Sequence, residues 1–577
     1  MTEKDGNLAT FSKKSPKAGT EGGPAKETRR VSAHDLAKKQ REIGVGEFFA
    51  RNKHLLGFDN PRKSLLTTVK EAIDNSIDAC EEAHILPEIS VQVIDMGKGE
   101  KFRVIVEDNG PGIVKKQIPN IFAKLLYGSK FHSRKQQRGQ QGIGISASVM
   151  YGQLTTGRAA RITSKIGKDD PAHYYELHIN TQQNKPEILK EETKEWAKDH
   201  GTRIEIDLEG SYQKGSQSID EYLKETAIVN PHVTIVYVNP KAEQLIFPRV
   251  TEEFPKEAKE IQPHPHGIEL GVLMKMLHDT QYTTAQQFLQ NEFSRVSPSV
   301  AKEILEEARI LPKAKPATLG RDEIEKLIEA FKKVKIMAPP TDCLSPITQE
   351  LLEKGLKKEV NAEFYTAVTR SPVVYKGNPF QVEVAIAYGG DQPKDKGANL
   401  MRFANRVPLL YQQGACATTK AVTSTNWKSY GLHQSRGSLP VGPLTIVLHI
   451  ASVWVPFTSE SKEAIAHYED IIKEMKLALQ EAGRKLGSYV KKKRRVHLEL
   501  KKRGYIEKYI PKLAEAVVEI LGKGKADEEE LISHLTALLE KTRGKVEDMS
   551  FDASKNEEYD AEWASIGKDE EGGERDE

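Results

Sequence analysis

Acidic and amide side chains recur on one face of a helix predicted over residues 61–83. Glu71, Asn75 and Asp78 follow one another at spacings of four and three residues, which places them on the same side of an α-helix. An asparagine carbonyl suits a Mg²⁺ ion that keeps most of its waters and bridges phosphates. The pattern therefore indicates a site for a cation and a water, although a solvated acidic helix face has the same spacing.

A second group of residues stands at the end of a predicted strand at 102–107. Asp108-Asn-Gly110-Pro-Gly112-Ile113 follows it directly. Glycine permits positive φ and lets the backbone approach a ligand closely. A carboxylate at a strand end can accept a hydrogen bond from an exocyclic amine such as N6 of adenine. A plain turn has the same composition, so this motif alone does not define a nucleotide site.

A glycine-rich loop opens another predicted helix. Gly139-Gln-Gln-Gly142-Ile-Gly144 leads into Ile-Ser-Ala-Ser148, and free amides at a helix N-terminus bind phosphate. The loop lacks the G-x-G-x-x-G register and does not follow a predicted strand, and the chain has no G-x-x-x-x-G-K-[ST] motif. A dinucleotide fold and a P-loop are therefore not indicated.

The hydrophobic pattern predicts the elements that hold these motifs. Alternating apolar residues predict strands at 89–95, 102–107, 160–166, 173–179 and 202–208. With the helix at 61–83, they predict an α/β domain that ends near Asn230. Residues 231–330 begin with a short extended piece at 233–238 and then have a mainly helical pattern. A second α/β unit is predicted from strands at 381–387, 400–410 and 443–455.

One long helix is predicted after this unit. Ser459 is a candidate N-cap, with Glu460 and Glu463 in the favoured first turn. Apolar residues then alternate spacings of three and four, which is a heptad stripe: Ile465, Tyr468, Ile472, Met475, Leu479, Ala482, Leu486 and Tyr489. Such a helix is either a stalk that carries motion between domains or a helix that lies on a sheet.

Length and composition limit the class of protein. The 577 residues exceed the roughly 250–300 at which a single core stops growing, so three or more domains are expected. No apolar run reaches the roughly 18 residues of a membrane span, and the N-terminus lacks a secretory pattern. The three cysteines lie far apart and predict neither zinc nor disulfides. A cytoplasmic protein is expected.

Charge is distributed unevenly, although the net charge is only +3. Residues 484–512 contain twelve Lys/Arg against two acidic residues, whereas residues 526–577 contain eighteen Asp/Glu against six Lys/Arg. This asymmetry indicates an anionic partner near the basic stretch and a solvated acidic tail. A merely solubilising surface is the alternative for each.

In this order, the three motifs and Gly201-Thr202 resemble the ATPase superfamily of gyrase, heat-shock chaperones, histidine kinases and mismatch-repair clamps. The resemblance covers about 40–230 and implies a two-layer α/β sandwich that binds ATP and Mg²⁺, with a mobile lid at about 114–144. It implies that Glu71 is the general base, that Asn75 holds Mg²⁺ and that Asp108 recognises adenine.

The same resemblance gives nucleotide contacts to the glycine-rich segments. Gly110 and Gly112 would line the base pocket, and Gly139, Gly142 and Gly144 would cradle the phosphates. Three residues beside these glycines are also expected to bind the nucleotide: Ile113, Gln141 and Ile143. Thr202 would support the base site through a water, and Lys130 matches a lid lysine near the phosphates.

Downstream motifs resemble one branch of this superfamily. Phe403-Ala-Asn-Arg-Val-Pro-Leu-Leu410 and Asn426-Trp-Lys-Ser-Tyr-Gly-Leu432 are similar to a transducer domain, where a lysine reaches the γ-phosphate; Lys428 is the match. With 48–58 and Pro263-His-Pro-His-Gly267, the start of a helix–two-turns–helix insert, they resemble the B subunits of DNA topoisomerase VI, the archaeal type IIB enzyme. This resemblance covers about 30–510.

The resemblance implies a multidomain α/β fold: an ATPase sandwich, a helical insert and an α/β transducer with a long C-terminal stalk helix. The expected boundaries are a disordered segment at 1–30, the ATPase domain at 31–230, the helix–two-turns–helix domain at 231–335, the transducer at 336–458, the stalk helix at 459–512 and a short helical segment with an acidic tail at 513–577.

The implied function is that of an ATP-hydrolysing component of a type II DNA topoisomerase. Two chains would dimerise on ATP binding and join two A subunits in an A2B2 heterotetramer. The complex would pass one DNA duplex through a break in another, relaxing supercoils and decatenating DNA, with no membrane partner. The basic stretch at 484–512 would contact DNA or the A subunit. A chaperone, a mismatch-repair clamp and a non-catalytic DNA-binding scaffold are the alternatives.

Overall fold

The computed structural model describes residues 33–38, 40, 42–97, 99–130, 133–139, 142–459, 461–521 and 527–543. The predictions for 1–30, Gln141, Glu460 and the tail after 543 lie outside the described residues. The chain divides into two compact units, Met1–Ile43 and Gly44–Glu577. The first contains the described helix α1 (Ala33–Ala37), and the second contains all the motifs above.

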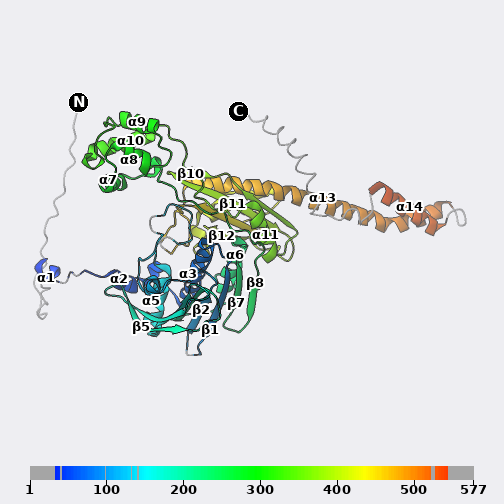
Figure 1. The fold of residues 1–577 in the computed structure, drawn as a ribbon. Helices are drawn as coiled ribbons and strands as arrows, with labels where there is room; N and C mark the ends of the chain where they lie inside the picture. Colours follow the sequence, from blue (N-terminus) through cyan, green and yellow to red (C-terminus); the bar gives the residue numbers. More distant parts are fainter. Residues whose placement is uncertain are drawn as a thin grey trace, which may run out of the picture. The chain divides into compact units, whose positions relative to one another are not determined.

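An eight-stranded sheet organises the first domain of the second unit (Figure 1). Its strand order is β5-β4-β3-β6-β2-β1-β7-β8, antiparallel throughout except for the parallel pair β1–β7. The strands are β1 (Glu88–Asp95), β2 (Lys101–Glu107), β3 (Ala160–Lys165), β4 (Ala172–Asn180), β5 (Lys185–Lys194), β6 (Gly201–Glu209), β7 (Thr234–Val238) and β8 (Gln244–Phe247). Buried side chains alternate along β1 and β3, so one sheet face carries the core, as the sequence pattern predicts.

Helices cover that apolar face. They are α2 (Val45–Arg51), α3 (Pro61–Glu82), α4 (Ile118–Ala123), α5 (Gly144–Thr156) and α6 (Ile219–Val229). The predicted helix at 61–83 is confirmed as α3, which starts where the Asn60 side chain accepts a hydrogen bond from the Lys63 amide and Pro61 takes the first helical position. Ile73 and Ile77 are fully buried against the sheet, so the face with Glu71 and Asn75 points away from it.

The predicted end of this domain near Asn230 is wrong. β7 and β8 belong to the same sheet, because β7 pairs in parallel with β1 across more than a hundred residues of chain. A local sequence pattern does not reveal a parallel partner that is so distant. The edge strand β5 was also missed, since eight of its ten residues are exposed and carry no apolar alternation.

A helical domain follows, as predicted within 231–335. It contains α7 (Leu270–Asp279), α8 (Ala285–Glu292), α9 (Pro298–Glu307) and α10 (Arg321–Lys333). These helices enclose a core of their own that runs from Ile268 to Ile336. The domain is therefore shorter at its start than predicted, because 234–247 belongs to the first sheet.

The second α/β unit is confirmed around a six-stranded sheet of order β10-β11-β14-β12-β13, with β9 paired to β11. Its strands are β9 (Phe364–Thr369), β10 (Val373–Tyr375), β11 (Asn378–Tyr388), β12 (Asn399–Ala404), β13 (Val407–Pro408) and β14 (Leu444–Ser452). Two helices accompany them, α11 (Gln349–Glu359) and α12 (Ala417–Ser424). β14 is buried along its whole length, as expected of a central strand covered on both faces.

The long helix is confirmed but starts later than predicted. α13 spans Glu469–Leu521, so Ser459 is not its N-cap and Ile465 and Tyr468 precede it. A β-bridge pairs Phe457 with Ile465 ahead of α13, so Ile465 does not belong to the helical heptad stripe.

α13 lies on a sheet over its first part, which is one of the two alternatives, and the role of a stalk that carries motion between domains stays a prediction. Its first third packs on β9 and β11, and its far part runs beyond the sheet and meets α14 (Glu528–Arg543) (Figure 1). In the described part of the chain, no helix is long and apolar enough to cross a membrane.

Candidate functional site

The predicted site residues converge on one cavity of about 680 Å³. Helix α3, the loop after β2 and the N-terminus of α5 form most of its wall, and residues 408–411 and 461–463 of the second α/β unit close one side. Of the predicted residues that the structure describes, these line the cavity: Glu71, Asn75, Asp108, Gly112, Ile113, Lys130, Gly139, Gly142, Ile143, Gly144 and Thr202. Gly110 and Lys428 lie outside its lining.

Asp108 is a buried residue that lines this cavity and accepts three hydrogen bonds. Its Oδ1 accepts hydrogen bonds from the amides of Gly110 and Thr202, both at 3.0 Å, and its Oδ2 accepts one from Ser76 Oγ at 2.8 Å. Burial raises the pKa of Asp108, although these three donors act in the opposite direction. Gly110 therefore contributes by orienting the carboxylate, and one acceptor position remains for a ligand.

The backbone around Asp108 needs glycine at Gly112. Its φ is +72°, and a Cβ there would collide with the carbonyl of Lys165. The next residue is fixed as well, since the Ile113 amide donates to Ser164 Oγ at 2.8 Å. Ser164 Oγ lies 3.0 Å from Thr202 Oγ1, so β3 and β6 support the same loop. The motif that starts at Asp108 can therefore be both a turn and part of a ligand site, because the turn forms one wall of the cavity.

Glu71 and Asn75 project from α3 one helical turn apart. The loop approaches Glu71 so closely that a Cβ on Gly144 would overlap its Oε2. Lys70 Nζ lies 3.4 Å from Glu71 Oε1. Asn75 is exposed on the cavity wall and can supply a neutral oxygen ligand.

The donor set fits Mg²⁺ bound together with a nucleotide. The described residues contain no group of three or more His, Cys, Asp or Glu side chains that could enclose a metal ion. Mg²⁺ in phosphate sites needs no such group, because one or two side chains, phosphate oxygens and waters complete its shell. The exposed Asn75 amide meets that requirement.

Asp78 departs from the predicted site on the helix face, whereas the predicted phosphate contact of Lys130 stays a prediction. Asp78 does not line the cavity; its two oxygens bind Lys130 Nζ at 2.8 Å and Arg138 Nη1 at 2.6 Å. Lys130 lines the cavity, but its ammonium lies against Asp78 and Glu82. Burial opposes the charged form, yet the two carboxylates raise the pKa of Lys130. In this structure, Lys130 is thus held on α3.

Lys462, which the sequence interpretation missed, lines the cavity from the second α/β unit. It has a positive φ of 53° in the turn before α13, and its Nζ lies 3.5 Å from the Arg138 carbonyl. Beside it, Glu463 forms an ion pair with Lys63 of α3. The sequence feature that could have identified it is a lysine just before the long helix. It was not recognised because the helix was predicted to start at Ser459.

Lys428 occupies a different surface. It lies in the 3₁₀ helix Trp427–Tyr430, where Trp427 is buried and its indole Nε1 donates to the Val422 carbonyl at 2.9 Å. The Lys428 side chain is exposed and is not part of the cavity lining. Its predicted contact with a terminal phosphate stays a prediction.

Comparison with known proteins agrees with this architecture. Residues 63–210 match the family of histidine kinase-, DNA gyrase B- and HSP90-like ATPases, and residues 339–502 match the topoisomerase VI B subunit transducer. The B subunit of type 2 DNA topoisomerase 6 from Methanosarcina acetivorans is 55% identical over 496 residues, covering 86% of this chain and 80% of that protein.

Two further relatives carry the same name. The Archaeoglobus fulgidus protein is 49% identical over 505 residues, which cover 87% of this chain and 83% of the relative. The Pyrococcus furiosus protein is 38% identical over 562 residues, which cover 88% and 96%. Identities of 38% to 55% over 86% to 88% of this chain show that the chain belongs to the family of type 2 DNA topoisomerase 6 B subunits.

Proposed function

We propose that this chain binds Mg·ATP in the cavity and hydrolyses it to drive a type II DNA topoisomerase. The observation that carries the proposal is the convergence of Glu71, Asn75, Asp108 and the glycine-rich loop on one cavity. These residues come from separate segments, and each has the chemistry that one part of a nucleotide requires.

Each group has a distinct part in this proposal. The remaining acceptor of Asp108 takes the exocyclic amine of adenine, and the α5 N-terminus presents amides to the phosphates. Asn75 holds Mg²⁺, which would neutralise charge on the phosphate oxygens. Glu71 accepts a proton from the water that attacks the γ-phosphorus, and ADP leaves with the bond electrons.

The second α/β unit, the transducer domain, reports the state of the nucleotide. We assign the phosphate-facing lysine to Lys462, because it lines the cavity. The Lys462 ammonium is a point charge that stabilises the terminal phosphate while ATP is bound. This contact is lost when the phosphate leaves. The turn containing Lys462 runs into α13, so a shift of this turn moves the long helix.

Family membership supports a proposal for the partners. ATP binding dimerises two chains around one DNA duplex, and the A subunit cleaves a second duplex, in an A2B2 complex. The far part of α13 with the basic stretch at 484–512 points to DNA or the A subunit as its contact. If it contacts DNA, each neutralised phosphate adds about 0.9 to the salt slope of binding.

ATP turnover by the purified chain tests the nucleotide part of the proposal. Glu71→Ala should lower turnover by roughly 10²- to 10⁴-fold, the usual contribution of a general base. Affinity for a non-hydrolysable ATP analogue and the dimerisation it induces should stay close to wild type. Loss of binding together with turnover would remove Glu71 from the role of base.

A further inference from the structure

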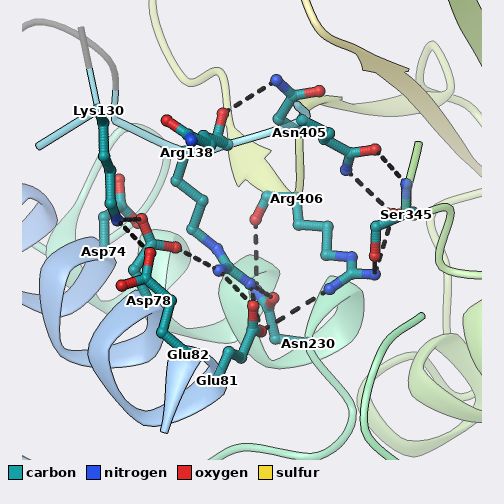
Figure 2. Close-up of polar contacts among 12 residues, drawn as sticks. Asp74, Asp78, Glu81, Glu82, Lys130, Arg138, Asn230, Ser345, Asn405 and Arg406 are labelled. Atoms are coloured by element: carbon teal, nitrogen blue, oxygen red, sulfur yellow. Dashed lines mark hydrogen bonds and ion pairs between the residues drawn. The ribbon is translucent and has the colours of Figure 1, made fainter. Parts of the chain in front are cut away.

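A buried ion cluster lies where α3, the segment 133–139 and the transducer domain meet (Figure 2). Arg138 is at its centre. Its Nη1 donates to Asp78 Oδ1 at 2.6 Å and to Glu81 Oε2 at 2.9 Å, and its Nη2 donates to Glu81 Oε1 at 2.7 Å and to Asn230 Oδ1 at 2.6 Å. The Arg138 side chain is only 5% exposed. A guanidinium fork with four acceptors has little freedom to move.

The transducer domain reaches the same cluster through a two-residue turn between β12 and β13. Asn405 and Arg406 both have positive φ, 49° and 64°. This conformation is unfavourable for an arginine, so the surroundings must hold it. Arg406 Nη2 donates to the carbonyl and the hydroxyl of Ser345 at 2.9 and 2.6 Å, and Arg406 Nη1 lies 3.7 Å from Glu81 Oε1.

Glu81 is therefore shared between the two domains. Burial works against its ionisation, yet Arg138, a hydrogen bond from His232 and Arg406 hold the pKa of Glu81 well below its ordinary value. Burial, partly opposed by Glu81, lowers the pKa of Arg406 to about 10, and neighbouring Arg138 adds to this. Glu81 thus interacts with both buried guanidinium groups, and removing either arginine changes the environment of the other.

The segment 133–139 is bound from the transducer side as well. Gln136 exchanges two hydrogen bonds with the backbone of Ser345, at 3.0 and 2.7 Å. Asn405 Nδ2 donates to the Gln137 carbonyl at 3.0 Å. The segment ends at Gly139, which lines the nucleotide cavity directly after Arg138.

Two cavity lysines meet this cluster. Lys130 binds Asp78, the carboxylate that also holds Arg138 (Figure 2). Lys462 lies 3.5 Å from the Arg138 carbonyl. If either lysine moves to a phosphate, a contact of the cluster is lost, so nucleotide binding and the transducer contacts are not independent.

We propose that Arg138 is a positioning residue that couples the nucleotide cavity to the transducer domain through Glu81 and Arg406. It holds Gly139 in place on the cavity side, and on the other side it shares Glu81 with the β12–β13 turn. This inference rests on the proposed ATPase function. It adds that turnover depends on Arg406, although Arg406 does not line the nucleotide cavity.

The test is a double-mutant cycle in the full chain with Arg138→Met, Arg406→Met and the double variant. ATP affinity, turnover at saturating ATP and the thermal midpoint are measured for each. Arg103→Met is the matched control, because Arg103 binds the buried Asp207 at 2.7 Å on the first sheet, away from the transducer domain.

Arg406→Met should lower turnover about tenfold, while its ATP affinity stays within about threefold of wild type, since no nucleotide contact is removed. The double variant should be no slower than the slower single variant, because both changes break one connection. Glu81→Gln should reproduce the loss. A purely structural cluster would instead lower the thermal midpoint, while turnover at saturating ATP, measured well below that midpoint, would stay at the wild-type value.

Wild-type turnover in a folded Arg406→Met chain, or losses that multiply in the double variant, would overturn the proposal. If a methionine variant does not fold, Arg406→Lys takes its place, since it keeps the charge but has one nitrogen and cannot contact Ser345 and Glu81 together, as Nη2 and Nη1 of the arginine do. Normal turnover in that variant would also overturn the coupling. Absence of ATP turnover in wild type would instead refute the ATPase function, so the two failures are distinguishable.

Discussion

Asp108→Asn should weaken ATP binding strongly while leaving the fold intact. The carboxylate has about four lone-pair positions. Three are taken by the amides of Gly110 and Thr202 and by Ser76 Oγ, so one is available to the adenine amine. In the asparagine variant, Oδ1 can keep the two backbone donors. The Nδ2 group then faces the adenine amine, and because both groups are hydrogen-bond donors, no hydrogen bond forms between them.

The magnitude follows from the hydrogen bond that is lost. A hydrogen bond to a charged acceptor contributes about 1.5–3 kcal/mol, which corresponds to an affinity loss of about 10- to 150-fold. The fold should tolerate the change, because Asn has nearly the same shape and the Ser76 hydroxyl can rotate to accept from Nδ2.

Titration with a fluorescent ATP analogue, alongside circular dichroism, measures both quantities. The ratio of GTP to ATP affinity should also rise in Asp108→Asn, since the amide can donate to O6 of guanine. Ser76→Ala is the control, because it removes one supporting donor but keeps the acceptor for adenine, and its loss should be smaller. An unaltered ATP affinity in Asp108→Asn would remove this carboxylate from base recognition.

Lys462→Ala should lower ATP turnover by about 10²-fold or more, as expected for loss of a charged group at the transferred phosphate, whereas Lys428→Ala should stay within about twofold of wild type. The reverse result would return the phosphate contact to Lys428. Acidification should destabilise the chain through His232 and Glu81. In the folded chain, the pKa of His232 lies below the ordinary 6.5 and the pKa of Glu81 lies below the ordinary 4.5. As the pH falls, both groups therefore take up protons in the unfolded chain before they do so in the folded chain, which favours unfolding. The thermal midpoint should fall below about pH 6.5 and again below about pH 4.5, and His232→Asn should flatten the first step; an unchanged first step would show that another group controls it.

The sequence predicted those parts of the fold whose signals are local. α3 carries a cap, an N-terminal proline and an apolar face, and each of these is visible within a few residues. The loops at Asp108 and Gly144 depend on glycine for steric reasons, so each motif can be recognised within a short stretch of sequence. Their convergence on one cavity was accessible only through the resemblance to known ATPases, because spacing along the chain does not report distance in space.

The remaining features depend on long-range contacts. β7 joins the first sheet through parallel pairing with β1, which moved the domain boundary beyond Asn230. The bridge between Phe457 and Ile465 removes Ile465 from a heptad stripe that is continuous in the sequence, and Lys462, which precedes Ile465, lines the cavity. Charged side chains on α3 looked equivalent by spacing, yet Asp78 is paired with Arg138 from a segment sixty residues away. Hydrophobic periodicity contains no information about such partners.

Unlinking of interlocked DNA circles tests the central claim most directly. The reaction contains Mg·ATP and this chain with or without a candidate A subunit. Decatenation should require both chains and hydrolysable ATP, and it should fail when Glu71→Ala replaces the wild-type chain. Turnover of ATP with no unlinking in the reconstituted complex, or unlinking that proceeds with Glu71→Ala, would contradict the assignment of this cavity as the site that drives duplex passage.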